Sequence, residues 1–389
     1  MRFVHCSDLH LGASRFGNER LRGDLTGAFM RMVEDVIERD VDAVIICGDV
    51  FDRFGADLLT LHEAEGALVK LKDSGIETIA IEGDHDIFFG RDASWLRFLA
   101  RRGLVKLLEA WGGESIDIRE WSEERGTGAF VDVEGARFFG IGHRVEAGLK
   151  SLRLLGKAIE PADLTVAMMH AGIGPRNSSD PGSITAPDSE LLREKVDYLA
   201  LGHVHRRFPI DGWIYNPGGL ENWRPEECIS GKGYFLVDVR GADYKVQAVD
   251  SVRRAGHLIS VDVSGLDTDA AINGAIKAAV MDAGIDPSSE PVVSVDLVGR
   301  PRFDLSRYDG GSMCSWIISR TGAVECLVND RTIIGPSVTV QSADAALRAM
   351  RSRIGTSAQS PNASRMTPEE RADLILRLPD AFRGMTGDR

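Results

Sequence analysis

The chain has 389 residues, of which 43% are hydrophobic and 27% are charged, and its formal net charge is −13. These values are ordinary for a globular protein of two or three domains. No window of about 18 uninterrupted apolar residues occurs, so the sequence predicts no membrane-spanning helix.

Residues 1 to about 250 alternate apolar runs with helical patterns. Five runs are expected to form strands: Phe3–Cys6, Ala43–Cys47, Thr78–Ile81, Leu164–Met169 and Tyr198–Leu201. Helices are expected at Leu21–Glu38, Leu58–Asp73 and Trp95–Arg102. Shorter, closely spaced strands are expected at Ala129–Val133, Arg137–Ile141, Gly233–Val239 and Tyr244–Val249. The pattern predicts a layered α/β domain over residues 1–250, in which hairpins extend a two-sheet core flanked by helices.

The pattern changes after residue 250. A strand at Leu258–Val263, a helix at Asp269–Ala283 and a strand at Pro291–Val298 predict a small β-α-β domain over residues 251–336. Residues 337–389 are expected to form a linker and a helical tail, with a second helix beginning at Thr367. From sequence, this tail helix either docks in a groove of a partner or folds onto its own chain.

Short polar motifs follow the five expected strands of the first domain and hold five of the nine histidines. They are Asp8-Leu9-His10, Gly48-Asp49-Val50-Phe51-Asp52, Gly83-Asp84-His85-Asp86, His170 and Gly202-His203-Val204-His205. In α/β sheets, ligands bind outside the carboxyl ends of the strands. We therefore expect these side chains to meet at one edge of the domain.

Imidazole and carboxylate ligands together suit first-row ions such as Mn²⁺, Fe²⁺ or Zn²⁺. Two such ions about 3.5–4 Å apart can clamp the attacking and leaving oxygens of a displacement at phosphorus. Each motif alone has a plainer interpretation, because Gly-Asp and Asp at a strand end are common turn residues. The occurrence of all five in this order favours a two-metal phosphoesterase.

The motifs resemble those of the calcineurin-like metallophosphoesterases and, among them, the SbcD-like nuclease subunit of the DNA double-strand-break repair complex. The resemblance rests on the motifs above, in particular His5-Cys6-Ser7-Asp8-Leu9-His10-Leu11-Gly12, His170-Ala171-Gly172 and Tyr215-Asn216-Pro217-Gly218-Gly219. It is strong over about residues 1–240 and weaker toward residue 335. It implies a Mn²⁺-dependent DNA nuclease with 3′→5′ exonuclease and single-strand endonuclease activity.

The resemblance also implies a role for each motif residue. Two divalent ions, with Mn²⁺ as the expected metal, are held by Asp8, His10, Asp49, Asp84, His170, His203 and His205, and Asp49 bridges both ions. His85 stabilises charge or protonates the leaving oxygen, and Asp52 orients His85.

One motif residue departs from the family, because Asp84 stands where Asn is usual. An ionised Asp84 keeps an oxygen ligand for the second ion but lacks the amide donor that Asn offers a phosphate. Asp84 is therefore interpreted either as a tolerated variant or as the mark of an impaired or altered catalyst.

The charge is unevenly distributed along the chain. Residues 251–389 carry 16 basic and 17 acidic side chains, so residues 1–250 carry 30 and 42. Nucleic-acid binding depends on local basic patches more than on total charge. In the domain that resembles a DNA-capping domain, Arg253, Arg254, Arg300, Arg302 and Arg307 either contact phosphates or form an ordinary solvated surface.

The resemblance implies three partners: DNA ends and single strands, an SMC-like coiled-coil ABC ATPase, and a second copy of the chain. Five cysteines without a Cys-x-x-Cys pair fit a reducing compartment, and an N-terminus that runs directly into a strand predicts no cleaved signal peptide. We therefore expect a cytoplasmic protein, and the resemblance implies that it is associated with the nucleoid. Two other functions remain open. One is a small-molecule phosphodiesterase or phosphatase, and the other is a catalytically weak DNA-end-binding scaffold in which Asp84 impairs phosphate handling.

Overall fold

The computed structural model describes most of the chain as far as residue 332. The described residues are 1–13, 18–52, 56–87, 94–110, 117–142, 152, 156–174, 183–302 and 304–332. The tail helix expected beyond residue 337 lies outside these ranges. Within them, no helix is both long enough and apolar enough to cross a membrane.

A seven-stranded sheet carries the first three motifs. Its order is β15-β14-β1-β2-β3-β4-β5, and β1 to β5 run parallel, whereas β14 and β15 are antiparallel additions. The strands are β1 (Arg2–Cys6), β2 (Ala43–Cys47), β3 (Glu77–Ile81), β4 (Lys106–Leu108), β5 (Thr127–Gly128), β14 (Gly233–Arg240) and β15 (Asp243–Asp250). The expected strand at Ala43–Cys47 is confirmed at both ends, and the strands at Phe3 and Thr78 each begin one residue earlier.

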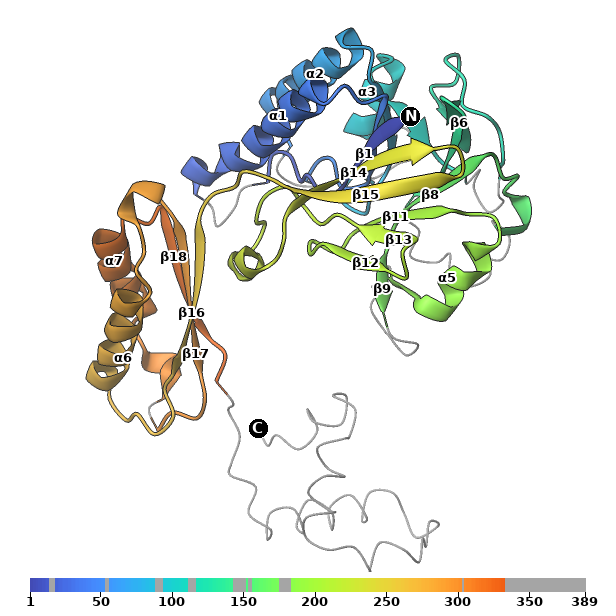
Figure 1. Cartoon of the computed structure of the whole chain (residues 1–389). Helices are drawn as coiled ribbons and strands as arrows, with labels where there is room; N and C mark the ends of the chain where they lie inside the picture. The colour runs from blue at the N-terminus through green and yellow to red at the C-terminus, as the bar shows by residue number, and fades with distance from the viewer. Residues whose placement is uncertain are drawn as a thin grey trace, which may run out of the picture.

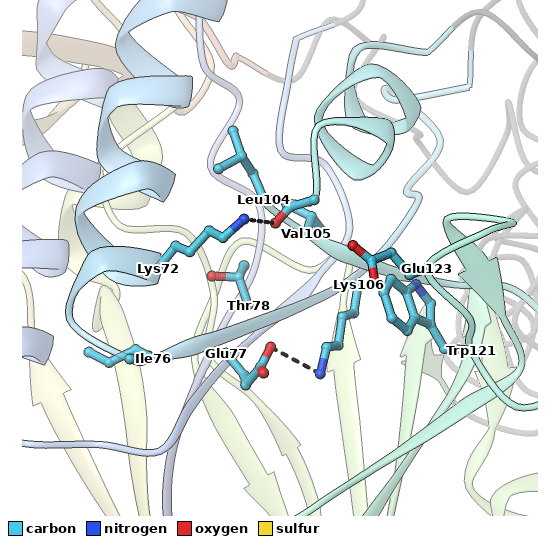
Figure 2. Close-up of a pocket in the computed structure, with 11 residues that line it drawn as sticks. Lys72, Ile76, Glu77, Thr78, Leu104, Val105, Lys106, Trp121 and Glu123 are labelled. Atoms are coloured by element: carbon cyan, nitrogen blue, oxygen red, sulfur yellow. Dashed lines mark hydrogen bonds and ion pairs between the residues drawn. The ribbon is translucent and has the colours of Figure 1, made fainter.

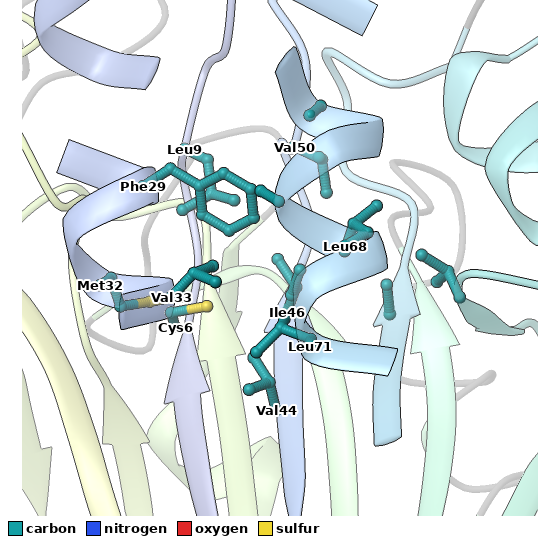
Figure 3. Packing of buried hydrophobic residues seen from close by; sticks show 14 of the residues in the cluster. Cys6, Leu9, Phe29, Met32, Val33, Val44, Ile46, Val50, Leu68 and Leu71 are labelled. Atoms are coloured by element: carbon teal, nitrogen blue, oxygen red, sulfur yellow. The ribbon is translucent and has the colours of Figure 1, made fainter. Parts of the chain in front are cut away.

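Three helices cover one face of this sheet: α1 (Arg22–Glu38), α2 (Leu58–Asp73) and α3 (Trp95–Arg101). Figure 3 shows the contact, in which Phe29 and Val33 of α1 and Leu68 of α2 pack toward the strand residues Cys6 and Ile46. The start of α2 is capped by Asp57, which accepts a hydrogen bond from the Thr60 amide at 2.9 Å. Burial of this apolar helix face holds the outer layer on the sheet.

The opposite face of the first sheet packs on a second sheet of six strands, ordered β12-β13-β11-β8-β7-β6. The strands are β6 (Phe130–Val133), β7 (Ala136–Gly142), β8 (Leu164–His170), β11 (Tyr198–Gly202), β12 (Phe208–Ile210) and β13 (Ile214–Asn216). Phe3 of β1 sits at the contact, with its ring 5.4 Å from Phe138 and 5.6 Å from Tyr198 in edge-on arrangements. A short pair, β9 (Gly172–Gly174) with β10 (Ser183–Thr185), and helix α5 (Ala186–Arg193) complete the outer side.

The remaining described residues form a third sheet with its own apolar cluster, seen in orange at the left of Figure 1. The sheet is parallel, in the order β16-β17-β18, and two helices flank it. The elements are β16 (Gly256–Asp262), α6 (Asp269–Asp282), β17 (Val292–Val298), α7 (Gly310–Thr321) and β18 (Glu325–Asp330), with short 3₁₀ helices η4 (Pro287–Ser289) and η5 (Leu305–Arg307). The expected β-α-β unit was therefore incomplete, because α7 and β18 extend it.

Polar contacts join this third sheet to the main domain. Arg254 pairs with Asp24 of α1 at 2.7 Å, and Asn18, just before η2 (Glu19–Leu21), donates to the Val324 carbonyl at 2.8 Å. Arg331 pairs with Glu226 of η3 (Pro225–Ile229) at 2.6 Å. The segment that carries η3 thus lies between the third sheet and the first two.

Candidate metal centre

The motif residues meet where the carboxyl ends of both large sheets converge. Asp8 and His10 follow β1, Asp49 follows β2, Asp84 and His85 follow β3, His170 ends β8, and His203 and His205 follow β11. Backbone hydrogen bonds lock the loops together, since the Asp8 amide donates to the Gly48 carbonyl at 3.1 Å and the His10 amide donates to the Asp49 carbonyl at 3.0 Å. Residues that are far apart in sequence therefore converge at one site.

The backbone at this edge is unusual. Asp8, His10, Asp49 and His203 have φ values of 53°, 44°, 54° and 80°, in the left-handed region that side chains other than glycine rarely adopt. Residues held in such conformations cost about 1–3 kcal/mol each and cluster at functional sites. The turns bring these side chains close to one another at the carboxyl ends of the strands.

Two glycines make this close approach possible. A Cβ on Gly83 would lie 2.1 Å from Oδ1 of Asp49, and a Cβ on Gly48 would lie 2.3 Å from Nδ1 of His170. Neither space accepts a side chain, so both positions require glycine for the motif side chains to pack as they do.

The first group of possible ligands is Asp8, His10 and His205, whose ligand atoms lie within 4.8 Å of one another. Nε2 of His10 faces Nε2 of His205 at 3.0 Å. Nδ1 of His10 is buried and has no hydrogen-bond partner in the described part of the chain. Burial lowers the pKa of His10 to about 4, which leaves the neutral imidazole that a metal ion needs.

The second group is Asp84, His170 and His203. Oδ1 of Asp84 lies 3.1 Å from Nε2 of His170 and 3.2 Å from Nδ1 of His203. Burial alone would lower the pKa of His170, but Asp49 and Asp84 raise it well above its usual value. These carboxylates therefore attract positive charge to the buried site, and a divalent cation could supply that charge.

Asp49 stands between the two groups. Its Oδ2 is 3.4 Å from Nε2 of His170 and 3.6 Å from Nε2 of His10, whereas its Oδ1 accepts the His85 amide at 2.9 Å. Burial favours protonation of Asp49, but His170 and His10 outweigh it and hold the pKa below its usual value. One oxygen of Asp49 is thus fixed by the backbone, and the other lies near a histidine of each group, where it could serve as a ligand. This donor set of imidazoles and carboxylates fits two divalent ions.

His85 and Asp52 lie beside these groups. Nδ1 of His85 is 3.1 Å from Oδ1 of Asp52, and this hydrogen bond raises the pKa of His85 above its ordinary value despite partial burial. The pairing favours the protonated imidazole. The His85 side chain is 24% exposed, whereas Asp52 is 13% exposed, so His85 is the more accessible partner.

Three residues that contact the site were not singled out from the sequence. The Trp223 indole stacks on His10 with ring centroids 4.7 Å apart and planes 4° from parallel. Glu227 accepts a hydrogen bond from Nδ1 of His205 at 2.8 Å and pairs with Lys232 at 2.5 Å. Although burial opposes ionisation, His205 and Lys232 lower the pKa of Glu227 to about 2. Such partners fix the ring orientation of a ligand histidine, but nothing in the sequence places this irregular segment near the motifs.

Asp86 is visible in the sequence as the last residue of the third motif, but the sequence alone predicts no role for it. Its buried carboxylate accepts hydrogen bonds from the amides of Gly83 at 2.9 Å, Val50 at 3.2 Å and Phe51 at 3.0 Å. These contacts tie the loop after β3 to the loop after β2, and so fix Asp49 relative to Asp84.

Two of the five candidate DNA-binding arginines are engaged within the protein. Arg254 donates to both oxygens of Asp24, at 2.7 and 2.9 Å. Arg253 donates to the Asn222 side chain at 2.8 Å and to the Cys228 carbonyl at 3.3 Å. Both guanidinium groups serve the junction between the third sheet and the main domain in this structure, which leaves them few donors for a phosphate.

The other three candidate arginines are exposed and lie near η5, away from the motif residues. Arg307 pairs with Asp304 at 3.5 Å, and its side chain is 80% exposed. The Arg300 amide donates to the Ser264 hydroxyl at 3.1 Å, and the Arg302 amide donates to the Leu266 carbonyl at 2.7 Å. Their part in DNA binding stays a prediction.

A separate pocket lies at the opposite edge of the first sheet, near the amino ends of β3 and β4 (Figure 2). Its two lysines are already engaged, because Lys72 donates to the Gly103 carbonyl at 3.0 Å and Lys106 pairs with Glu77 at 3.1 Å. The pocket is therefore poorly suited to a phosphate and does not belong to the candidate metal centre.

Comparison with known proteins agrees with this geometry. The chain is 30% identical over 277 residues to the DNA double-strand break repair protein Mre11 of Methanopyrus kandleri, covering 68% of the chain and 60% of that protein. It is 25% identical over 309 residues to the protein of the same name from Sulfolobus acidocaldarius, covering 77% and 75%. It is 24% identical over 276 residues to the uncharacterized metallophosphoesterase YhaO of Bacillus subtilis, covering 65% and 61%.

The chain thus spans about 60% of the length of the Methanopyrus protein. The calcineurin-like phosphoesterase profile matches residues 1–207, which include every motif residue of the candidate metal centre. The chain belongs to the calcineurin-like phosphoesterase family.

Proposed function

We propose that the chain is a two-metal DNA nuclease subunit that hydrolyses phosphodiester bonds in double-strand-break repair. The observation that carries the proposal is the position of Asp49 between two groups of possible ligands, with His85 at their exposed side. The similarity to proteins named for double-strand break repair supports DNA as the substrate.

The bound ions would supply charge stabilisation and an activated water for attack at phosphorus. The chain's own groups hold and orient the reacting partners. Glu227 orients the His205 imidazole by accepting a hydrogen bond from its Nδ1. Asp8 and Asp49 accept hydrogen bonds from the backbone amides of His203 and His85, which fixes the loops that carry these histidines. The hydrogen bond to Asp52 raises the pKa of His85 and so favours its protonated form. An imidazolium at this position can donate its proton from Nε2 to the leaving oxygen.

More specifically, we propose that the chain has Mn²⁺-dependent 3′→5′ exonuclease activity and single-strand endonuclease activity. The test compares duplex DNA labelled at its 3′ or 5′ end, circular single-stranded DNA, bis(p-nitrophenyl) phosphate and a phosphomonoester, each with and without Mn²⁺. Release of nucleotides from 3′ ends and opening of the circle are expected. Cleavage of the monoester alone would contradict the proposal and favour a small-molecule phosphatase.

A second candidate function rests on Asp84. Its carboxylate lies close to His170 and His203 of the second group, and its side chain is 37% exposed. If its charge repels the phosphate, the chain binds DNA ends with little cleavage. Tight binding of DNA ends in a gel-shift measurement, together with no product in the cleavage assay, would support this alternative.

We also propose a homodimer and a complex with an SMC-like ABC ATPase at the nucleoid. Leu58 and Leu59, at the start of α2, are 76% and 59% exposed, and Phe98 of α3 is 42% exposed. Exposed apolar side chains of this size suit a protein contact. Light scattering of the purified chain tests the dimer, and Leu58→Asp with Leu59→Asp should yield monomers. Co-purification with the ATPase tests the complex.

A further inference from the structure

The segment that follows Leu220 forms a wall beside the candidate metal centre. Trp223 stacks on His10, and its ring centroid also lies 5.0 Å from His205 and 5.6 Å from His85. Its backbone amide donates to Oε2 of Glu227 at 3.0 Å. Trp223 therefore contacts three of the histidines, and its position is fixed relative to the reacting groups.

Arg224 is the next residue, and its guanidinium carbon lies 5.2 Å from the centroid of the Trp223 ring. A guanidinium over an indole is held there by cation–π attraction. Since the Trp223 and His10 centroids are 4.7 Å apart, the guanidinium carbon lies within about 10 Å of the His10 ring. The charge of this exposed side chain is thus held close to the metal centre.

The neighbouring carboxylates do not neutralise Arg224. Glu226 pairs with Arg331 at 2.6 Å, and Glu227 is shared by Lys232 and His205. Among the residues that the structure describes, Arg224 takes part in no ion pair or hydrogen bond through its side chain. By contrast, Arg253 and Arg254 nearby are engaged with protein groups.

We propose that Arg224, held by Trp223, binds the backbone phosphate next to the scissile one and thereby favours polynucleotides over small phosphodiesters. The proposal rests on the nuclease function proposed above and adds a specificity residue to it. A guanidinium matches a phosphate because it can form two parallel hydrogen bonds. In a domain with 30 basic and 42 acidic residues, a single cation at this position has a large effect on an approaching polyanion.

The test uses Arg224→Gln, which removes the charge, and Arg240→Gln as the matched control. Arg240 is an exposed arginine at the end of β14, on the edge of the sheet away from the metal centre. For both variants and the wild type, kcat/KM is measured on a single-stranded oligonucleotide and on bis(p-nitrophenyl) phosphate, which has one phosphate only. Binding of the oligonucleotide is followed by fluorescence anisotropy against salt, in a His85→Ala background that slows cleavage.

Arg224→Gln should lower kcat/KM on the oligonucleotide about tenfold relative to kcat/KM on bis(p-nitrophenyl) phosphate. The slope of log Kd against log salt should fall by about 0.7, the value for one lost contact to a single strand. Arg240→Gln should change neither quantity. An unchanged slope in Arg224→Gln, or an equal loss in Arg240→Gln, would overturn the proposal while leaving the nuclease function intact. If the wild type cleaves neither substrate, the proposed function itself fails.

Discussion

Nδ1 of His85 lies 3.1 Å from Oδ1 of Asp52, and the pair stands at the exposed side of the groups that would hold two metal ions. Asp52 comes from the loop after β2 and His85 from the loop after β3, so the contact depends on two parallel strands that pair residue for residue. The hydrogen bond raises the pKa of His85 and favours its protonated form, which is the form that the proposed proton donation requires.

The role of His85 can be separated from metal binding. His85→Ala should lower kcat by about 10²–10⁴-fold, because the proton is donated mainly in the transition state. Metal content and oligonucleotide affinity should stay close to the wild-type values, since the ligand groups keep their other contacts. Single-turnover kinetics and metal analysis measure the two effects. Normal turnover in the variant would remove His85 from the mechanism.

Asp49 is predicted to be essential for both ions. Asp49→Ala removes a carboxylate whose Oδ2 approaches Nε2 of both His10 and His170, at 3.6 and 3.4 Å. Calorimetric titration with Mn²⁺ should show two binding events in the wild type and a severe loss of both in the variant, together with loss of hydrolysis. A variant that still binds two ions tightly would show that another group bridges them.

Asp84 is predicted to weaken substrate binding and to strengthen binding of the second ion. Two unit charges about 4 Å apart interact by about 1–4 kcal/mol at high to intermediate dielectric, so a carboxylate here repels the phosphate and attracts the second ion. Asp84→Asn should therefore raise nuclease activity and also raise the Mn²⁺ concentration for half-maximal rate. If Asp84→Asn instead has lower activity and binds Mn²⁺ more tightly, the native Asp84 favours catalysis and the prediction is wrong.

The junction between the third sheet and the main domain should depend on Arg254. Arg254→Ala removes the two hydrogen bonds that Arg254 donates to Asp24, which is 14% exposed, and should lower the free energy of unfolding by about 1–3 kcal/mol. Urea denaturation measures the change. Arg307→Ala is the control, because the Arg307–Asp304 pair is exposed and should contribute nothing measurable. Equal stability of the two variants would show that the Arg254–Asp24 pair does not stabilise the junction.

The motif strands were predictable because buried parallel strands have continuous apolar sequences. Two of these strands, Ala43–Cys47 and Leu164–His170, are buried along their whole length. Polar residues at or just after the end of each apolar run mark where the strand stops. The strand ends also placed the motif residues at one edge. Helix α7 was missed because it begins with Gly310-Gly311, which are poor helix formers, and buries few large residues.

The surroundings of the site were not predictable from the sequence. Trp223 and Glu227 lie in an irregular segment whose approach to His10 and His205 depends on the packing of two sheets. Arg253 and Arg254 looked like a free basic pair because their partners are distant in sequence; Asp24 is 230 residues away from Arg254. The pattern of neighbouring residues in the sequence does not reveal side-chain contacts between residues that are far apart along the chain.

The left-handed backbone at Asp8, His10, Asp49 and His203 has a consequence for the stability of the fold. Glycine adopts this conformation without strain, so a glycine at any of these positions would relieve backbone strain and at the same time remove a possible metal ligand. Changes that stabilise a fold commonly reduce activity where the active site is strained. At this edge of the domain, folding and ion binding would therefore favour different residues at the same positions.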